Sequence, residues 1–536
     1  MKKRLLSSVL ALSLIMLSAC GSSSSTSTST TNDTAASKTE TSSTDSDNSS
    51  ENTLTEEAEL TPVTITMMQE LFSDSAPDLN DEWYTYLTDN LGVTLDVNFI
   101  PTQSYVDKIT TTIASGDLPM VISANSSVLK NQGVLDMIDD EEFWDLTDII
   151  KDYPNLYEFV GADRWTTSAI EGKNWGIPRL RVLPRNGGVI RQDWLDALGL
   201  DMPETFDELY DVLYAFTYND PDGNGADDTY GVVTSYVGTG NRGWNGFQTL
   251  AVAFGAPNTW GYIDGTMVPD FGTQEYMNAL KYIKKLYDNG VMNKNFNEIT
   301  AEDRKTEYMA GNYGAVFCVI DDIQGLQSGL VQAVDTADSK VLGALTEKKG
   351  DTIRICATSG YNGLVMFPKY GDGTIQTEED LRRVLSFFDA MCTDEYQNLM
   401  NYGIEGITYD VVDGVRTLKT TENGSLVLDV QKGDISQILP AADFVRKDDD
   451  SEMLTYLYDT IEERMDYAIL DDTAGLKSST YNDLSSELDA IMMDAAVNFV
   501  IGTIDEEGYW AAYDQWLADG GQDVIDEFTE AYELYR

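Results

Sequence analysis

Apolar and polar residues alternate along the chain in two patterns that predict two kinds of element. At residues 63–67 every second residue is apolar, which is typical of a strand, and residues 93–99 repeat this pattern. A mixed stretch separates the two segments, and a short apolar strand is expected at 120–122. Strand, helix and strand at this spacing predict a βαβ unit and therefore a parallel sheet.

Three later segments repeat apolar residues every three or four positions, which predicts amphipathic helices. The first begins after Thr205, whose side chain is expected to cap it while Glu208 reaches back to complete a capping box. The second begins at Thr273 and stops at Gly290, and the third begins near Glu378. We expect their apolar faces to pack in cores.

The N-terminal segment follows neither pattern. Three basic residues at 2–4 precede an apolar stretch at 5–16, which is too short to span the ~30 Å hydrocarbon layer of a membrane as a mature helix. The sequence Leu-Ser-Ala-Cys at 17–20 resembles the lipobox of bacterial lipoproteins, in which the cysteine takes a diacylglycerol before cleavage. We therefore predict that residues 1–19 are a signal peptide and that Cys20 carries the lipid. An ordinary secretory signal with a chance cysteine is the alternative.

Residues 20–60 are almost all small or polar and include no aromatic residue. Such a segment buries too little apolar surface to offset its ordering entropy, so it is predicted to be a disordered tether. Its average span is roughly 35 Å by random-coil scaling. The expected location is the extracellular face of the cell membrane, held there by the lipid alone, and a tether of this length suits a Gram-positive wall.

Composition removes several classes of function. The net charge is −56, from 35 basic and 91 acidic residues, and such a field repels nucleic acid and anionic lipid. The absence of histidine excludes Ser-His-Asp and Cys-His catalysis and the commonest zinc ligand. After Cys20 the remaining cysteines are isolated in apolar contexts, which predicts free buried thiols: Cys318, Cys356 and Cys392.

The body that follows the tether is expected to form two lobes, because roughly 475 residues exceed what one hydrophobic core holds. Residues 176–188 are rich in Gly and Pro, and glycines recur at Gly343, Gly350 and Gly360. Both places join apolar strands and are the candidate crossings between lobes. The predicted division assigns residues 61–180 and 355–435 to lobe 1 and residues 181–354 and 436–536 to lobe 2.

Four segments share their sequence and their order with one protein family. They are SGDLP at 115–119, EGKNWGIP at 171–178, the stretch from RQDWL to PETFDE within 191–208, and YGIEGITY at 402–409. Behind a lipobox and a tether, they resemble family 1 extracellular solute-binding proteins, the sugar-binding lipoproteins of ABC importers, in the oligosaccharide-binding branch. One departure is Met120, which stands where the family motif continues with aspartate.

This resemblance implies an α/β, two-lobed fold of the type II periplasmic-binding-protein kind, with hinge strands and a ligand cleft between the lobes. It also implies a monomer that captures an oligosaccharide and delivers it to permease subunits without chemistry on the ligand. A surface glycoside hydrolase or lyase with a carboxylate pair is the main alternative, since 91 acidic residues leave room for such a pair. A calcium-stabilised adhesin is a third.

A loop with the spacing of an EF-hand points to calcium. Oxygen-bearing groups stand at loop positions 1, 3, 5, 7 and 9: Asp220, Asp222, Asn224, the Ala226 carbonyl and Asp228. Gly225 permits the bend at position 6, but Gly231 replaces the usual bidentate glutamate at position 12. We predict a structural Ca²⁺ site, with a metal-free turn as the alternative.

Sugar sites combine aromatic faces, which stack on pyranose rings, with planar polar side chains that bind hydroxyls. Residues of these types follow strands or lie near the crossings: Glu70, Trp83, Arg179, Arg181, Trp244, Asn245, Tyr361, Asn362 and Tyr402. Core packing is the alternative for each of them. Trp194 is expected in the core, and Trp260 is left open. The acidic field disfavours uronic acids unless Arg179 and Arg181 compensate for it locally.

Overall fold

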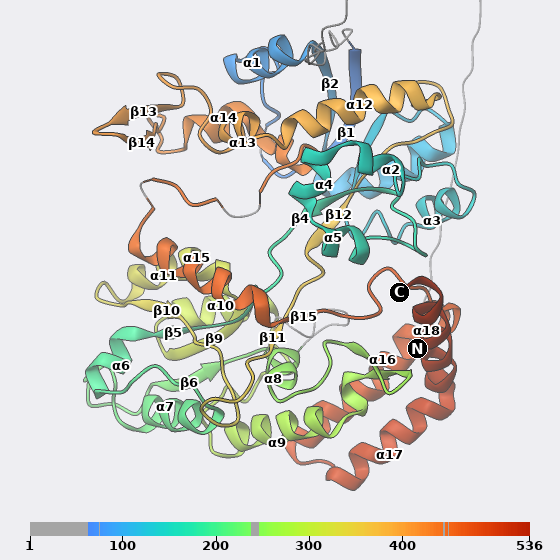
Figure 1. Cartoon of the computed structure of the whole chain (residues 1–536). Coiled ribbons are helices and arrows are strands. Elements are labelled where there is room, and N and C mark those ends of the chain that lie inside the picture. Colours follow the sequence, from blue (N-terminus) through green and yellow to red (C-terminus); the bar gives the residue numbers. More distant parts are fainter. Residues whose placement is uncertain (1–62, 74, 237–245, 443–444, 449) are drawn as a thin grey trace, which may run out of the picture. The chain divides into compact units, whose positions relative to one another are not determined.

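A five-stranded sheet organises the first part of the folded chain (Figure 1). The structure is a computed structural model that describes residues 63–73, 75–236, 246–442, 445–448 and 450–536. The strand order is β2-β1-β3-β12-β4. The parallel strands are β1 (Val63–Leu71), β2 (Val93–Pro101) and β3 (Val121–Ala124), and β12 (Tyr361–Met366) runs antiparallel between β3 and β4 (Gly176–Leu180). With α1 (Glu82–Leu91) between β1 and β2, the predicted βαβ unit is confirmed.

Each face of this sheet has its own core, because successive side chains of a strand point to opposite faces. Met68 and Ile122 pack beneath α2 (Thr102–Ser115) and α3 (Gln132–Asp139). Met67 and Val121 pack on the other face. That face is covered by α1 and by α4 (Pro154–Val160), α5 (Ala162–Thr167), α12 (Glu378–Met391), α13 (Asp394–Asn401) and α14 (Val427–Lys432).

A second, four-stranded sheet has the order β10-β5-β9-β6. Its strands are β5 (Asn186–Arg191), β6 (Tyr230–Val233), β9 (Tyr313–Val319) and β10 (Ser339–Val341). One core of this lobe contains α6 (Gln192–Leu198), α7 (Phe206–Tyr218), α8 (Phe247–Ala253), α9 (Gln274–Asp288), α16 (Ser479–Ile501), α17 (Glu506–Trp516) and α18 (Gln522–Tyr535). The other contains α10 (Ala301–Met309), α11 (Ile323–Ala333) and α15 (Glu452–Arg464). Two sheets with separate cores make the two-lobed α/β fold that was predicted.

The helix starts follow from local side-chain capping. Thr205 Oγ1 accepts the Glu208 N–H at 3.2 Å, as predicted. Thr273 Oγ1 likewise accepts the Tyr276 N–H at 3.2 Å, at the predicted start of α9. The Glu208 carboxylate reaches back to the start of α7, as predicted, and its closest backbone donor there is the N–H of Glu204 at 3.0 Å.

Two passages between the sheets run side by side. The residues after β4 bond to those before β12: the Arg181 N–H donates to Gly360 O and the Thr358 N–H to Leu183 O, each at 2.8 Å. A further passage follows α14. Ile438 and Leu439, which the predicted division places in lobe 2, pack in the same core as α12 and α13 of the first sheet.

The cysteines agree in part with the prediction of free buried thiols. The three described cysteines are free, with Cys318 and Cys356 buried and Cys392 partly buried. Burial raises the pKa of the Cys356 thiol to about 12, so it remains protonated at neutral pH. In the described part of the chain, no helix combines the length and the apolar character that a membrane crossing requires.

Candidate functional site

Several predicted ligand residues gather at one edge of the five-stranded sheet. Leu364 of β12 pairs with both Ala124 and Pro178, so the end of β3, the end of β4 and the start of β12 lie beside one another. The end of β1 belongs to the same edge, because β1 is parallel to β3. Four predicted residues lie at this edge, with Arg181 directly after it: Glu70, Arg179, Tyr361 and Asn362.

Arg179 is the most constrained of these side chains. It is 7% exposed, and its Nη2 donates to Gln437 Oε1 while Nη1 lies 3.4 Å from Ser123 Oγ. Ser123 Oγ in turn donates to the Gln437 carbonyl at 2.8 Å. Burial, together with the nearby charge of Arg181, lowers the pKa of the Arg179 guanidinium to about 10. The edge of the sheet therefore holds a positive charge at neutral pH.

Glu70 lies at the same edge and is 4% exposed. Its Oε2 accepts a hydrogen bond from Asn125 Nδ2 at 2.7 Å. Asn125 Oδ1 accepts the N–H groups of Ser127 and Val128, which fixes the turn after β3. A carboxylate and a planar amide are thereby held rigidly beside each other, as a site that recognises hydroxyl groups requires.

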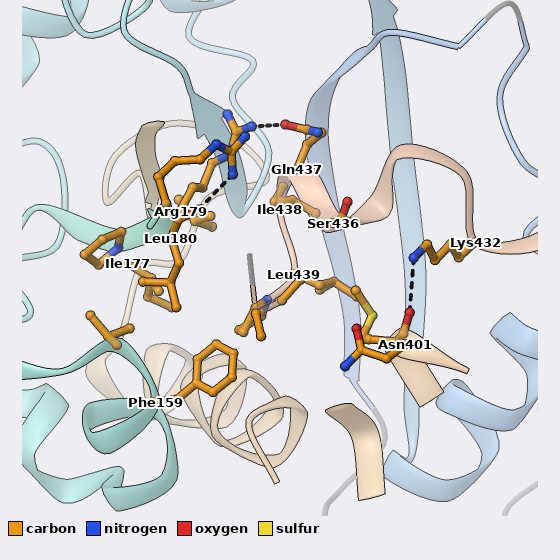
Figure 2. Close-up of a pocket in the computed structure, with 18 of the residues that line it drawn as sticks. Phe159, Ile177, Arg179, Leu180, Asn401, Lys432, Ser436, Gln437, Ile438 and Leu439 are labelled. Carbon is orange, nitrogen blue, oxygen red and sulfur yellow. Dashed lines mark hydrogen bonds between the residues drawn. The ribbon is translucent and has the colours of Figure 1, made fainter. Parts of the chain in front are cut away.

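A cavity of about 370 Å³ adjoins Arg179 (Figure 2). Four basic residues line it: Arg179, Arg181, Arg185 and Lys432. Apolar side chains that include Phe159, Ile177 and Leu439 also line it. A second hollow of about 240 Å³ shares Phe159 and Arg181 with the first and adds Arg164, Arg446 and Tyr458. Polar groups on an apolar lining are typical of ligand sites.

Two of the cations have identified partners. Arg185 forms a bidentate ion pair with Asp321, which follows β9 in the second lobe. Lys432 Nζ donates to the Met400 carbonyl at 3.1 Å and lies 3.7 Å from Asp429 Oδ1. Burial lowers the pKa of the Lys432 ammonium.

The structure places other predicted residues away from this cavity. Trp83 is fully buried, and its Nε1 donates to the Leu399 carbonyl at 3.0 Å. Tyr402 is 2% exposed, and the Arg416 guanidinium lies 3.7 Å from its ring centroid. Both therefore pack in the first lobe. Trp194 and Trp260 are core residues of the second lobe, and Trp244 and Asn245 fall outside the described residues.

Comparison with known proteins identifies the family. The family model of the bacterial extracellular solute-binding protein matches residues 75–346, which is more than half of the chain. The chain belongs to this family. Its members bind solutes and are not enzymes, so the hydrolase and lyase alternative has no support here.

Relatives extend this match along the chain. Lipoprotein LipO of Bacillus subtilis (strain 168) is 35% identical over 494 residues, 90% of this chain and 95% of LipO. The polygalacturonan/rhamnogalacturonan-binding protein YtcQ of the same organism is 33% identical, over 82% of this chain and 85% of YtcQ. A solved structure of an EF-hand mutant of the S. pneumoniae ABC-transporter substrate binding protein FusA, in complex with fructo-nystose, has the same fold. It covers 88% of this chain and 99% of FusA, at a TM-score of 0.59 and 18% identity.

Some residues of the solute-binding protein's cavity carried no signal in the sequence. Ser123 and Gln437 contact Arg179 but stand in no motif, and Phe159 and Lys432 read as ordinary helix residues. The Gln437–Arg179 contact joins residues 258 positions apart. Only the fold brings these side chains together.

The EF-hand-like loop of this solute-binding protein joins α7 to β6. The amide Nδ2 of Asn224 lies 2.8 Å from Asp222 Oδ2 and 3.1 Å from Asp228 Oδ1, and the backbone N–H of Asn224 donates to Asp220 Oδ1 at 3.0 Å. Burial and the carboxylates of Asp220 and Asp228 raise the pKa of Asp222. The carboxylates of Asp220, Asp222 and Asp228 thus all contact the backbone or side-chain nitrogen of Asn224.

The fit of this loop to calcium is partial. In the described part of the chain, no three acidic or cysteine side chains are grouped as a metal requires in the conformation present. The carboxylate and amide oxygens of the loop nevertheless suit a hard cation. Gly231 at position 12 has a structural reason, because a Cβ there would lie 2.6 Å from the carbonyl oxygens of Leu213 and Val291. A glutamate is therefore excluded from that position by packing.

Proposed function

We propose that this solute-binding protein captures an oligosaccharide between its lobes and delivers it to the permease subunits of an ABC importer. The observation that carries the proposal is the edge of the five-stranded sheet. There Glu70 with Asn125, Arg179 with Gln437, and Tyr361 lie next to the two passages that connect the sheets.

The relatives support a sugar ligand. YtcQ is named for binding polygalacturonan and rhamnogalacturonan, and FusA is an ABC-transporter substrate-binding protein for fructooligosaccharides. The side chains at the edge suit the same chemistry. Carboxylate, amide and guanidinium groups bind hydroxyls, and the half-buried rings of Phe159 and Tyr361 offer apolar faces for pyranose rings.

Closure of the two lobes would complete the site. Neighbouring passages at 181–185 and 357–360 form a narrow connection, which is the arrangement of a hinge between domains. The proposed lobes are residues 61–180 with 355–439 and residues 181–354 with 440–536. They differ from the predicted division, in which lobe 1 ended at 435, because Leu439 packs in the core of lobe 1. The receptor is proposed to act as a monomer.

The anchor and the metal complete the proposal. A lipid on Cys20 and a tether at 20–60 would hold the receptor at the extracellular face of the membrane and leave it free to reach the permease. We also propose that Asp220, Asp222, Asn224, the Ala226 carbonyl and Asp228 hold Ca²⁺. The ion would neutralise carboxylates that otherwise repel one another. The loop joins α7 to β6 in the second lobe, whereas the sheet edge belongs to the first lobe.

The test is a panel of oligosaccharides, each measured for thermal stabilisation and for chemical change. A receptor is stabilised by at least one sugar, which is recovered intact. A sugar that is cleaved by the protein would overturn the proposal, and so would a panel without any stabilising sugar. Glu70→Gln should weaken the stabilisation, whereas Glu530→Gln, an exposed position on α18, serves as the matched control.

A further inference from the structure

The charge of the cavity in Figure 2 is opposite to that of the chain. Acidic residues outnumber basic ones by 91 to 35 in the sequence. Among the described residues that line the cavity, however, four are basic and none is Asp or Glu. A solvated acidic surface does not produce such a reversal, so the cations call for a separate explanation.

Arg179 carries a charge that its neighbours do not neutralise by contact. Its two bonded partners, Ser123 and Gln437, are neutral, and its Nε has no hydrogen-bond partner among the described residues. Burying an ionised group is costly unless it is paired and hydrogen-bonded. The charge of the Glu70 carboxylate acts on Arg179 without a hydrogen bond between the two side chains, and Glu70 Oε2 accepts from Asn125.

Lys432 presents a second cation at another side of the cavity, beside Asn401 (Figure 2). Its nearest partner is the neutral Met400 carbonyl, and Asp429 lies 3.7 Å away with its side chain 58% exposed. Arg185 is already paired with Asp321. The inference rests on neither Arg185 nor Arg181. Two incompletely paired cations, Arg179 and Lys432, therefore border one space.

We infer that this cavity binds an acidic oligosaccharide, with Arg179 and Lys432 each directed at a carboxylate of a uronic acid residue. Charge-assisted hydrogen bonds from guanidinium and ammonium groups are the strong bonds to carboxylates. Leu439 lies between the two cations in Figure 2, and Phe159 also lines the cavity, so both offer apolar surfaces that suit the sugar rings. This inference rests on the proposed function and narrows its substrate class to oligouronides.

The test compares three trisaccharides of the same sugar backbone by calorimetry on the full-length protein in detergent: trigalacturonate, its methyl ester and neutral galactotriose. We expect trigalacturonate to bind at least about tenfold more tightly than the ester, since a hydrogen bond between ionised groups contributes more than a neutral one. Its affinity should fall as salt is raised. Binding of galactotriose or the ester as tightly as the acid overturns the inference and leaves the proposed function intact.

Single substitutions test whether Arg179 and Lys432 produce the preference for the acidic sugar. Arg179→Gln and Lys432→Met should each lower trigalacturonate affinity by about tenfold or more and leave the affinity for the ester nearly unchanged. Arg383→Gln, on the exposed face of α12, is the matched control for a lost positive charge. If Arg179→Gln does not fold, Lys432→Met carries the test. Equal losses for the acid and the ester would overturn the assignment of these two cations. Failure of every neutral and acidic sugar to bind overturns the proposed function itself.

Discussion

The guanidinium of Arg416 donates two hydrogen bonds to the carboxylate of Asp448, from Nε to Oδ2 at 2.8 Å and from Nη2 to Oδ1 at 3.0 Å. Arg416 belongs to the hairpin of β13 (Tyr409–Val412) and β14 (Val415–Leu418) and also covers the ring of Tyr402. Asp448 lies in the passage that leads from the first lobe to α15. The pair therefore ties this passage to the first lobe.

The Arg416–Asp448 pair should make the stability of the fold depend on pH in the acidic range. The bonds from Arg416 lower the pKa of Asp448 to about 2, below its ordinary value of 3.8. A carboxyl group with a lowered pKa stabilises the fold above its ordinary pKa, and the stabilisation disappears as the pH falls toward 2. Asp448→Asn should lower the melting temperature slightly at pH 7, and the difference from the parent should shrink below pH 4. A constant difference across this range would contradict the prediction.

Trp83 should prove to be a core residue rather than a sugar platform. Removal of a fully buried tryptophan leaves a cavity, and the Leu399 carbonyl loses its donor. Trp83→Ala should lower the free energy of unfolding by about 3–5 kcal/mol, measured by urea denaturation. The sugar affinity of the fraction that remains folded should not change. A large loss of affinity at unchanged stability would place Trp83 in the ligand site.

Two aspartates of the EF-hand-like loop allow calcium binding to be tested with a matched control. A chelator should lower the melting temperature of the parent, because an ion bound only to the folded state stabilises it by about 2.7 kcal/mol at ~100 times its Kd. Asp222→Asn should remove most of this response. Asp227→Asn should keep it, since Asp227 stands at position 8 of the loop, outside the predicted ligands. An identical response in the parent and in Asp222→Asn would rule out this site.

The carboxyl group of Asp471 should affect the pH dependence of stability in the opposite direction from that of Asp448. Its Oδ1 accepts hydrogen bonds from the backbone and the hydroxyl of Thr473, and burial raises its pKa to about 6. The folded state thus binds a proton that the unfolded chain has released, so the group destabilises the fold as the pH rises from about 4 to above 6. Asp471→Asn should raise the melting temperature at pH 7.5 and have little effect at pH 4.

The anchor is testable by fractionation. Cys20→Ser should move the protein from the membrane to the medium, because one thiol is the predicted attachment point of the lipid. Cys392→Ser, which alters a partly buried free thiol in the first lobe, should leave the protein on the membrane. Retention of Cys20→Ser on the membrane would show that another contact holds it there.

The helices and strands were predictable where a few neighbouring residues decide them. The hydroxyls of Thr205 and Thr273 cap helices that begin one residue later, and the alternation at 63–67 produced β1. The EF-hand spacing also brought Asp222, Asn224 and Asp228 together, because a loop this short has little choice of path.

The assignment of aromatic and polar side chains to the ligand site was less predictable. Trp83 and Tyr402 are of the residue types that stack on sugar rings, yet both are buried in the first lobe. Gly231 departs from the EF-hand pattern at position 12. The carbonyl oxygens that a side chain there would meet belong to α7 and to the residues after α9. Such contacts join distant segments, so no local pattern encodes them.

The α/β class, the helix starts, the EF-hand-like spacing and the family could be predicted from the sequence, because they depend on residues within a few positions of one another or on motifs in order. The charges that meet could be found only in the folded chain. Arg179 contacts Ser123, 56 positions away, and Gln437, 258 positions away, and it shares a cavity with Lys432. The physical reason is that the register of β4 against β12 and the packing of the chain after α14 set these distances, and both depend on the whole core.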